Sequence, residues 1–79
     1  MNPLFITVTI ETSGVQADIR IDSQQKIGEG LKVLRSSNKL PQGSNPDFFR
    51  SNVKERLVSA YKTFNEESIF DGDILTVIE

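Results

Sequence analysis

The strongest constraint on the fold is a strict alternation of aliphatic and polar residues near the start of the chain. From Leu4 to Ile10 every second residue is a large aliphatic one, whereas Phe5, Thr7 and Thr9 occupy the positions between. This period of two predicts a β-strand with one buried face, because successive side chains of a strand point to opposite sides. We expect Leu4, together with the aliphatic residues that follow at alternate positions, to face the core.

A second alternating segment follows a turn at residues 12–14, where Gly14 can adopt a positive φ. Its inward positions are predicted to be Val15, Ala17, Ile19 and Ile21. Two alternating segments joined by so short a loop predict a β-hairpin.

The period then changes to that of a helix. Ile27, Leu31 and Leu34 recur at intervals of four and three residues, which places them on one helical face. Asp22 or Ser23 is expected to cap the N-terminus of this helix, which should end around residues 36–38. Residues 28 and 30 are glycines, each of which weakens a helix by roughly 1 kcal/mol relative to alanine. Close packing of the helix against the sheet is the simpler explanation, and close approach of a ligand is the alternative.

The second half of the chain is less regular. Residues 36–47 form a polar loop, which is either a connector or a site of partner contacts. Short strands are preferred at residues 48–50 and 56–60, with a turn between them. A helix is the alternative, because Val53, Leu57, Tyr61 and Phe64 also fall near helical spacing. A final strand follows the turn at residues 71–73, with its residues 75 and 77 inward.

The predicted order of elements is therefore a hairpin, a helix, short strands and a last strand. The best burial places the helix across one face of a mixed sheet, with the first and last strands as parallel neighbours at its centre. We predict one domain over residues 1–79 of the α+β class. It is a β-grasp of four to five strands, with one main helix packed across one face.

Composition excludes several classes of function. The chain has no cysteine and no histidine, so the commonest nucleophiles, general bases and metal ligands are missing, and we expect no enzyme. The best acidic cluster, Asp71 with Asp73, lacks the closing glutamate of a calcium loop, so no metal or other cofactor is expected. Nine basic and eleven acidic residues do not favour nucleic-acid binding. No apolar run approaches the ~20 residues of a membrane span, and we expect a cytoplasmic protein without a signal peptide.

The run FFRSNVKERLVSAYKTFNEESIFDGDILTVIE, residues 48–79, carries a family resemblance. Its features are an aromatic pair followed by arginine (48–50), a charged turn with Lys54, and the apolar pair Leu57-Val58. Phe64 then precedes an acidic turn, and Ile69 precedes residues 71–73. These features resemble the second half of the YukD/EsaB family, small ubiquitin-like proteins linked to type VII (WXG100) secretion in Gram-positive bacteria. The ubiquitin fold also has the predicted order of elements.

The resemblance implies a non-enzymatic accessory or regulatory protein of a type VII secretion system. Its implied partners are proteins, such as cytosolic parts of the membrane complex or its ATPase, and a weak homodimer is left open. Ubiquitin-like modifiers act through a C-terminal Gly-Gly tail, and no glycine follows Gly72 in this sequence, so we expect no conjugation. Two alternatives are a modifier or sulfur carrier with a shortened tail, and an effector subunit of a multicomponent oxygenase.

Six residues form the predicted partner-binding surface, namely Phe5, Phe49, Arg50, Lys54, Arg56 and Ile78. Strand parity places the three apolar ones on the sheet face away from the helix, which is the usual binding face of ubiquitin-like proteins. The three cations are expected near that face, with Phe49 as the anchor and Arg50 on the rim. The alternative is that these are ordinary surface residues without a partner.

Overall fold

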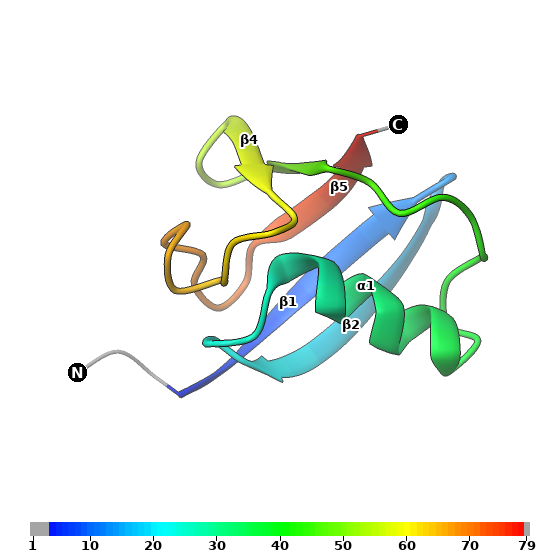
Figure 1. The fold of residues 1–79 in the computed structure, drawn as a ribbon, viewed down its shortest axis with the longest axis horizontal. Helices are drawn as coiled ribbons and strands as arrows, with labels where there is room; N and C mark the ends of the chain where they lie inside the picture. The colour runs from blue at the N-terminus through cyan, green and yellow to red at the C-terminus, as the bar shows by residue number, and fades with distance from the viewer. Residues whose placement is uncertain (1–3, 79) are drawn as a thin grey trace.

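The structure is a five-stranded mixed sheet with one α-helix across one face (Figure 1). This computed structural model describes residues 4–78. The elements follow in the order β1 (Phe5–Thr12), β2 (Val15–Asp22), α1 (Ile27–Ser36), β3 (Phe48–Ser51), β4 (Arg56–Ser59) and β5 (Ile74–Ile78). Across the sheet the strand order is β2-β1-β5-β3-β4, and β5 runs parallel to β1. The predicted architecture, with the last strand at the centre of the sheet, is confirmed.

The N-terminal hairpin pairs along its whole length, from Phe5 opposite Asp22 to Thr12 opposite Val15. The inward positions of β1 are buried as predicted, and so are Ile19 and Ile21 in β2. Leu4 and Val15 are exposed, so their predicted burial is wrong. Both residues lie at ends of the hairpin. A strand of eight residues is ~26 Å long, whereas the helix of ten residues is ~15 Å long. The helix is therefore too short to cover the ends of the hairpin.

The start of α1 differs from the prediction. Lys26 occupies the N-cap position without a side-chain cap, so the predicted capping by residues 22 or 23 is wrong. Backbone carbonyls of the segment after β4 replace the cap: Ile27 N–H donates to Lys62 C=O (2.9 Å), and Gly28 N–H donates to Ala60 C=O (3.0 Å). This segment satisfies amides that a helix start otherwise leaves free.

The glycines of α1 allow close packing, as the simpler explanation proposed. A Cβ added at Gly28 would lie 3.1 Å from the Ala60 carbonyl oxygen, and one at Gly30 would lie 3.3 Å from Cδ1 of Ile10. Both distances are shorter than ordinary van der Waals contact between such atoms. The missing side chains therefore let α1 lie directly against the sheet and against the segment after β4.

The core lies between α1 and the sheet. Its side chains come from every strand, from the helix and from the loops, and include Ile10, Leu31, Phe49, Phe64 and Leu75. The short strands β3 and β4 are as predicted, with a turn between them. The helical alternative for this region is wrong, since Val53 and Tyr61 are exposed and no helix forms there.

The turn before β5 fastens the last strand into the middle of the sheet. Thr7 N–H donates to the Asp71 carboxylate (2.7 Å), and Gly72 N–H donates to Thr7 C=O (2.9 Å). Gly72 has φ +88°, a conformation that glycine adopts at little cost. The side chain of Asp73, buried at 3% exposure, accepts hydrogen bonds from the Ser51 hydroxyl and from the Val53 and Ile74 amides. The turn thus joins β1 on one side to the β3–β4 hairpin on the other.

Replacing Asp73 with alanine should lower the free energy of unfolding by about 3 kcal/mol. The Ser51 hydroxyl and the Val53 amide would both lose a charged acceptor in a buried place. Ser51→Ala should cost less, about 1–2 kcal/mol, because Asp73 keeps its two amide donors and only the Lys54 amide loses its acceptor, the Ser51 hydroxyl. Urea unfolding at neutral pH measures both values, and an equal loss in the two variants would contradict this role of Asp73.

Candidate protein-binding surface

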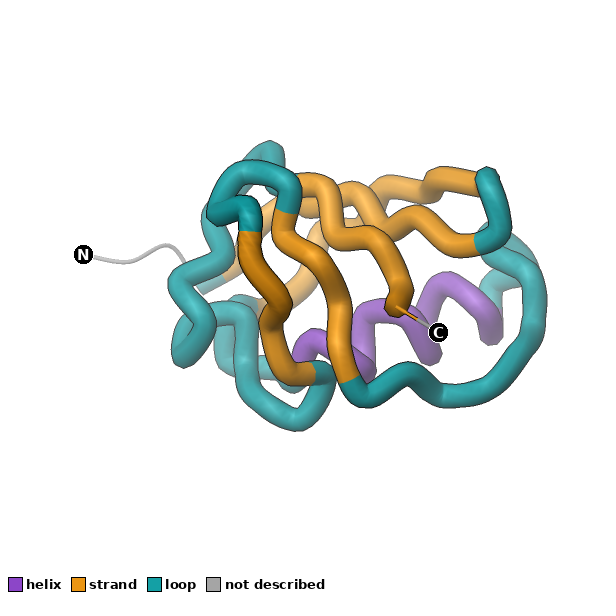
Figure 2. Tube along the Cα trace, turned by 90° about the horizontal axis from the view of Figure 1, so that it is seen from above, coloured by secondary structure: helices purple, strands orange, loops and turns teal. Residues whose placement is uncertain are grey.

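The sheet face opposite α1 is not covered by a helix in residues 4–78, as Figure 2 shows from above. We call it the outer face. It carries the alternate side chains of each strand that do not point to the core, among them Thr7 in β1 and Thr76 in β5. Because α1 covers the other face of the sheet, the side chains on the outer face are the ones that a partner can contact.

The predicted anchor, Phe49, does not lie on this face. Its side chain is 0% exposed and belongs to the core, so the prediction that it anchors a partner surface is wrong. In the register of β3, Phe49 lies opposite Val58 of β4 and Val77 of β5, both on the core side. The neighbouring Phe48 therefore points outward, because a shift of one residue exchanges the two faces of a strand.

Three exposed apolar side chains lie together on the outer face. Phe48 is the direct cross-strand neighbour of Ile78, and Leu57 lies diagonally from Phe48, within reach of an aromatic ring. Their exposed fractions are 48% for Phe48, 38% for Ile78 and 52% for Leu57. We call these three residues the apolar cluster. It spans β5, β3 and β4.

Charged and polar residues border the apolar cluster on one side. Arg50 is exposed and lies between Leu57 and Thr76 in the register of the sheet. Beyond Thr76 lies Glu11 of β1, which accepts a hydrogen bond from the Gln16 side chain (2.8 Å). Arg50 therefore lies on the same face as Phe48, and its role at the rim of a partner surface stays a prediction.

Phe5 is exposed on the outer face but lies far from the apolar cluster. The register of β1 and β5 places Glu11 beside Thr76, so Ile78 lies level with Ser13. Phe5 is eight residues from that level, roughly 26 Å along the strand. Its ring instead lies 5.4 Å from the guanidinium of Arg20. The structure does not bring Phe5 and Ile78 together.

The two remaining predicted residues also lie outside the cluster. Lys54, in the turn between β3 and β4, places its ammonium 5.1 Å from the ring centre of Phe70. Arg56 has the parity of the buried Val58 and forms an ion pair with Glu67 (3.4 Å). Of the six predicted residues, Arg50 and Ile78 lie at the apolar cluster.

A buried arginine shapes the loop beside the cluster, and the sequence analysis missed it. Arg35 is 6% exposed and donates to the carbonyl oxygens of Pro41 (3.0 Å), Gly43 (3.2 Å) and Ser44 (3.1 Å). The loop it holds lines, with Ile78, an open hollow of about 500 Å³. A signal was present in the sequence, since residue 35 lies four positions after Leu31 on the apolar side of the helix.

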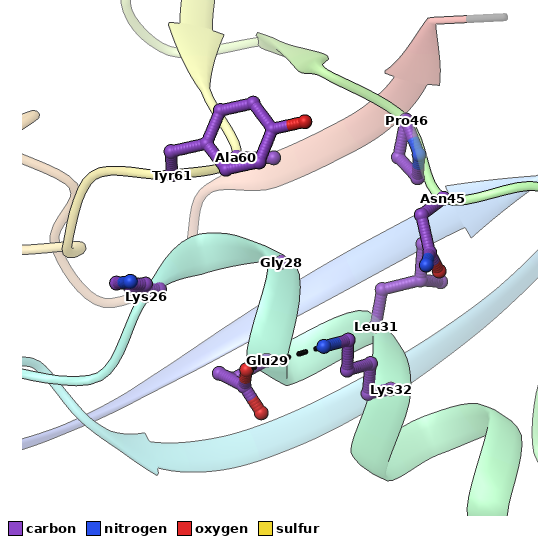
Figure 3. Close-up of a pocket in the computed structure, with 9 residues that line it drawn as sticks. All are labelled: Lys26, Gly28, Glu29, Leu31, Lys32, Asn45, Pro46, Ala60 and Tyr61. Atoms are coloured by element: carbon purple, nitrogen blue, oxygen red, sulfur yellow. Dashed lines mark hydrogen bonds and ion pairs between the residues drawn. The ribbon is translucent and has the colours of Figure 1, made fainter.

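A second groove lies on the helix side of the molecule (Figure 3). Lys32 forms an exposed ion pair there with Glu29 (3.5 Å). The Tyr61 hydroxyl donates to the Asp47 carboxylate, and this hydrogen bond raises the pKa of Tyr61 above its ordinary value. The volume of about 210 Å³ is below the ~300 Å³ at which small-molecule sites begin. We therefore place the candidate site on the outer face.

Two further findings concern residues 4–78. In that range no three histidine, cysteine, aspartate or glutamate side chains gather where they could bind a metal ion. None of its helices is long and apolar enough to cross a membrane.

Comparison with known proteins identifies the fold. No protein-family model matches the sequence, and no curated protein matches it. A de novo designed protein based on ubiquitin aligns with 98% of this chain and 90% of its own, with a TM-score of 0.72 and 19% identity. The chain has the ubiquitin-like β-grasp fold. The EccD5 ubiquitin-like domain from Mycobacterium xenopi also aligns, over 96% of this chain and 94% of that domain, with a TM-score of 0.60 and 23% identity.

In this ubiquitin-like chain the segment after β4 returns along the outer edge of that strand. The Glu67 carboxylate accepts a hydrogen bond from Ser59 N–H (2.7 Å) and another from Arg56 (3.4 Å). The hydrogen bond from Ser59 is the main reason that the pKa of Glu67 lies below its usual value; the bond and charge of Arg56 act in the same direction, against the effect of burial. Glu67 therefore holds Arg56, which strand parity already places away from the outer face, at the edge of the sheet.

The Glu67 contacts predict a pH dependence of stability. Because the pKa is lowered on folding, the carboxylate stabilises the folded state above the usual pKa, and this stabilisation is lost as pH falls through the lower folded value. Glu67→Gln should cost about 1 kcal/mol at neutral pH. Its unfolding free energy should also fall less steeply than that of the wild type when the pH is lowered from about 5 to 3. Urea unfolding over this range measures the slope, and parallel slopes would contradict the assignment.

The opposite orientations of the two adjacent phenylalanines predict different costs of truncation. Phe49→Ala should lower the free energy of unfolding by about 3–5 kcal/mol, because it leaves a cavity in the core. Phe48→Ala should cost less than about 1 kcal/mol, since its ring is half exposed. Thermal unfolding followed by circular dichroism distinguishes the two, and similar losses would contradict the register of β3.

Proposed function

We propose that this chain is a non-enzymatic, non-conjugated accessory or regulatory protein of a bacterial type VII secretion system. It acts in the cytoplasm by binding a protein partner through the outer face of its sheet. The observation that carries the proposal is the apolar cluster on the face that α1 leaves uncovered.

The composition of the cluster supports protein binding. Contiguous exposed apolar side chains on a small protein mark interaction sites more often than single ones do. Phe48 stands at the centre of the cluster, and an aromatic anchor with an arginine at its border is typical of residues that dominate binding energy. Arg50 supplies that charge, and the loop held by Arg35 adds a hollow next to Ile78.

Two likenesses support the secretion system as the setting. The resemblance to the YukD/EsaB family falls on residues 48–79, which include Phe48, Arg50 and Leu57 of the proposed surface. The second likeness is the ubiquitin-like domain of EccD5, a domain of a mycobacterial type VII component. Three of the residues that carry the family resemblance thus lie on the proposed binding surface, whereas others, such as Phe49 and Phe64, belong to the core.

Deleting the gene should reduce export of WXG100-type substrates, and the wild-type protein should restore it. Phe48→Lys should fail to restore export at equal protein levels, because a charge replaces the anchor of the cluster. The matched control is Val33→Lys, which changes an equally exposed aliphatic residue on α1 and should restore export. Unchanged export after deletion, or full restoration by Phe48→Lys, would contradict the proposal.

The two alternative functions have their own signatures. Capture of partners from native cells by the tagged wild-type protein should recover a secretion component, and this capture should be lost in Phe48→Lys. Recovery of a di-iron hydroxylase instead would favour the oxygenase effector. A covalent adduct or thiocarboxylate, seen by intact mass after incubation with cell extract and ATP, would favour the modifier.

A further inference from the structure

The two edges of the sheet are protected to different degrees. At the β4 edge, Ser59 N–H donates to the Glu67 carboxylate, and Arg56 donates to the Glu67 carbonyl (3.0 Å), so the following segment covers this strand. The opposite edge is β2, which has eight residues and is the outermost strand on its side (Figure 1). An edge strand of this length presents a row of backbone groups to which another strand can pair.

The backbone groups on the β2 edge can be assigned from the hairpin register. Ser23 N–H donates to Leu4 C=O (2.7 Å), one position beyond the pair of Phe5 and Asp22. Hydrogen-bonded pairs alternate along an antiparallel ladder, so the odd-numbered residues of β2 turn their backbone groups to β1. The even-numbered residues turn theirs to the open edge. Asp22 C=O already accepts from Gln25 N–H, which leaves Gln16, Asp18 and Arg20 as the open stretch.

We propose that β2 pairs antiparallel with β2 of a second copy of this chain, about a two-fold axis at Ile19. The two sheets then form one continuous sheet. In this register Asp18 and Arg20 of each copy exchange backbone hydrogen bonds with Arg20 and Asp18 of the other. The partner is a second copy because the side chains of β2 complement themselves about Ile19.

Side-chain pairing on both faces supports this axis. On the outer face Asp18 lies opposite Arg20 of the second copy, twice by symmetry, and opposite charges at such positions stabilise strand pairing. On the core side Ile19 lies opposite Ile19 of the second copy, and Ala17 lies opposite Ile21 of the second copy. The interface is isologous, since each contact occurs twice, which is the geometry of a closed dimer.

Other axes give poorer pairing. An axis at Asp18 places two aspartates opposite each other, and one at Arg20 does the same for two arginines, which is destabilising. An axis at Ile21 again pairs aspartate with arginine, but it uses only the end of β2 and the carbonyl of Asp22 that Gln25 occupies. The axis at Ile19 centres the pairing on the open stretch and makes its hydrogen-bonded pairs from Asp18 and Arg20, whose backbone groups face the edge.

The two charged side chains are already held on the outer face in the single chain. The Asp18 carboxylate accepts a hydrogen bond from the Thr9 hydroxyl (2.6 Å), and the Arg20 guanidinium lies over the Phe5 ring. Both side chains are therefore partly ordered before pairing, which reduces the entropy lost on association. The pairing is independent of the apolar cluster, because β2 and β3 are separated by two strands.

Reversing one charge at a time tests the pairing. Asp18→Arg alone and Arg20→Asp alone each place like charges opposite in both symmetric pairs, and each should weaken self-association at least tenfold. An equimolar mixture of the two variants should form a heterodimer, because every reversed side chain then meets an opposite charge. Analytical ultracentrifugation at concentrations up to millimolar measures association, and native mass spectrometry separates the heterodimer from either homodimer by mass.

The controls make the result specific to this edge. Arg50→Asp has the same charge change on the outer face and should associate as the wild type does; circular dichroism verifies that every variant is folded. A wild-type protein that stays monomeric, or a mixture that forms no heterodimer, would overturn the proposal. Self-association that is lost in Arg50→Asp or Phe48→Lys would also overturn it, since the copies would then pair through the outer face. The test uses purified protein, so its outcome does not depend on the secretion role.

Discussion

The insertion of β5 between β1 and β3 joins the two halves of the sheet and completes the core. Before β5 pairs, the sheet consists of two separate hairpins, and the core has no central strand. Thr9 N–H donates to Asp73 C=O on one side of the insertion, and Asn52 N–H donates to Ile74 C=O on the other. Asp73 joins these sides, because its backbone carbonyl accepts from Thr9 of β1, whereas its buried carboxylate binds groups from β3 and from the turn that follows β3. Leu75 then completes the core beneath α1.

The candidate binding surface is a product of the same insertion. Phe48, Leu57 and Ile78 come from three different strands and become neighbours only when β5 lies beside β3. With its single helix on the other face, the sheet leaves this cluster open (Figure 2). Arg35 extends the surface at one side, because its bonds to three loop carbonyls hold the loop next to Ile78. A buried guanidinium thus shapes the surface without contacting a partner.

The two sheet edges show how one chain treats similar backbone groups differently. The segment after β4 uses Glu67 to occupy an outward amide of that strand, and its backbone carbonyls also replace a side-chain cap at the start of α1. This short irregular segment therefore satisfies polar groups at two places that would otherwise need water. The β2 edge has no such cover among the described residues; its alternating charges, Asp18 and Arg20, fit a second copy of themselves.

The elements that could be predicted from the sequence are those whose signal is local. The alternation in residues 4–21 depends on neighbouring residues alone, and it predicted the hairpin; the recurrence of Ile27, Leu31 and Leu34 did the same for α1. The order of these elements was sufficient to predict the mixed sheet with β5 at its centre.

Contacts between distant strands determine which of two adjacent phenylalanines faces the core. A strand of four residues that begins with two phenylalanines has no alternation to orient it, so the pairing of Phe49 with Val58 and Val77 set its direction. Contacts between distant parts of the chain also explain three other findings. These are the burial of Arg35, the pairing of Arg56 with Glu67, and the separation of Phe5 from Ile78. Each depends on contacts between residues distant in the chain, and a local pattern contains no information about them.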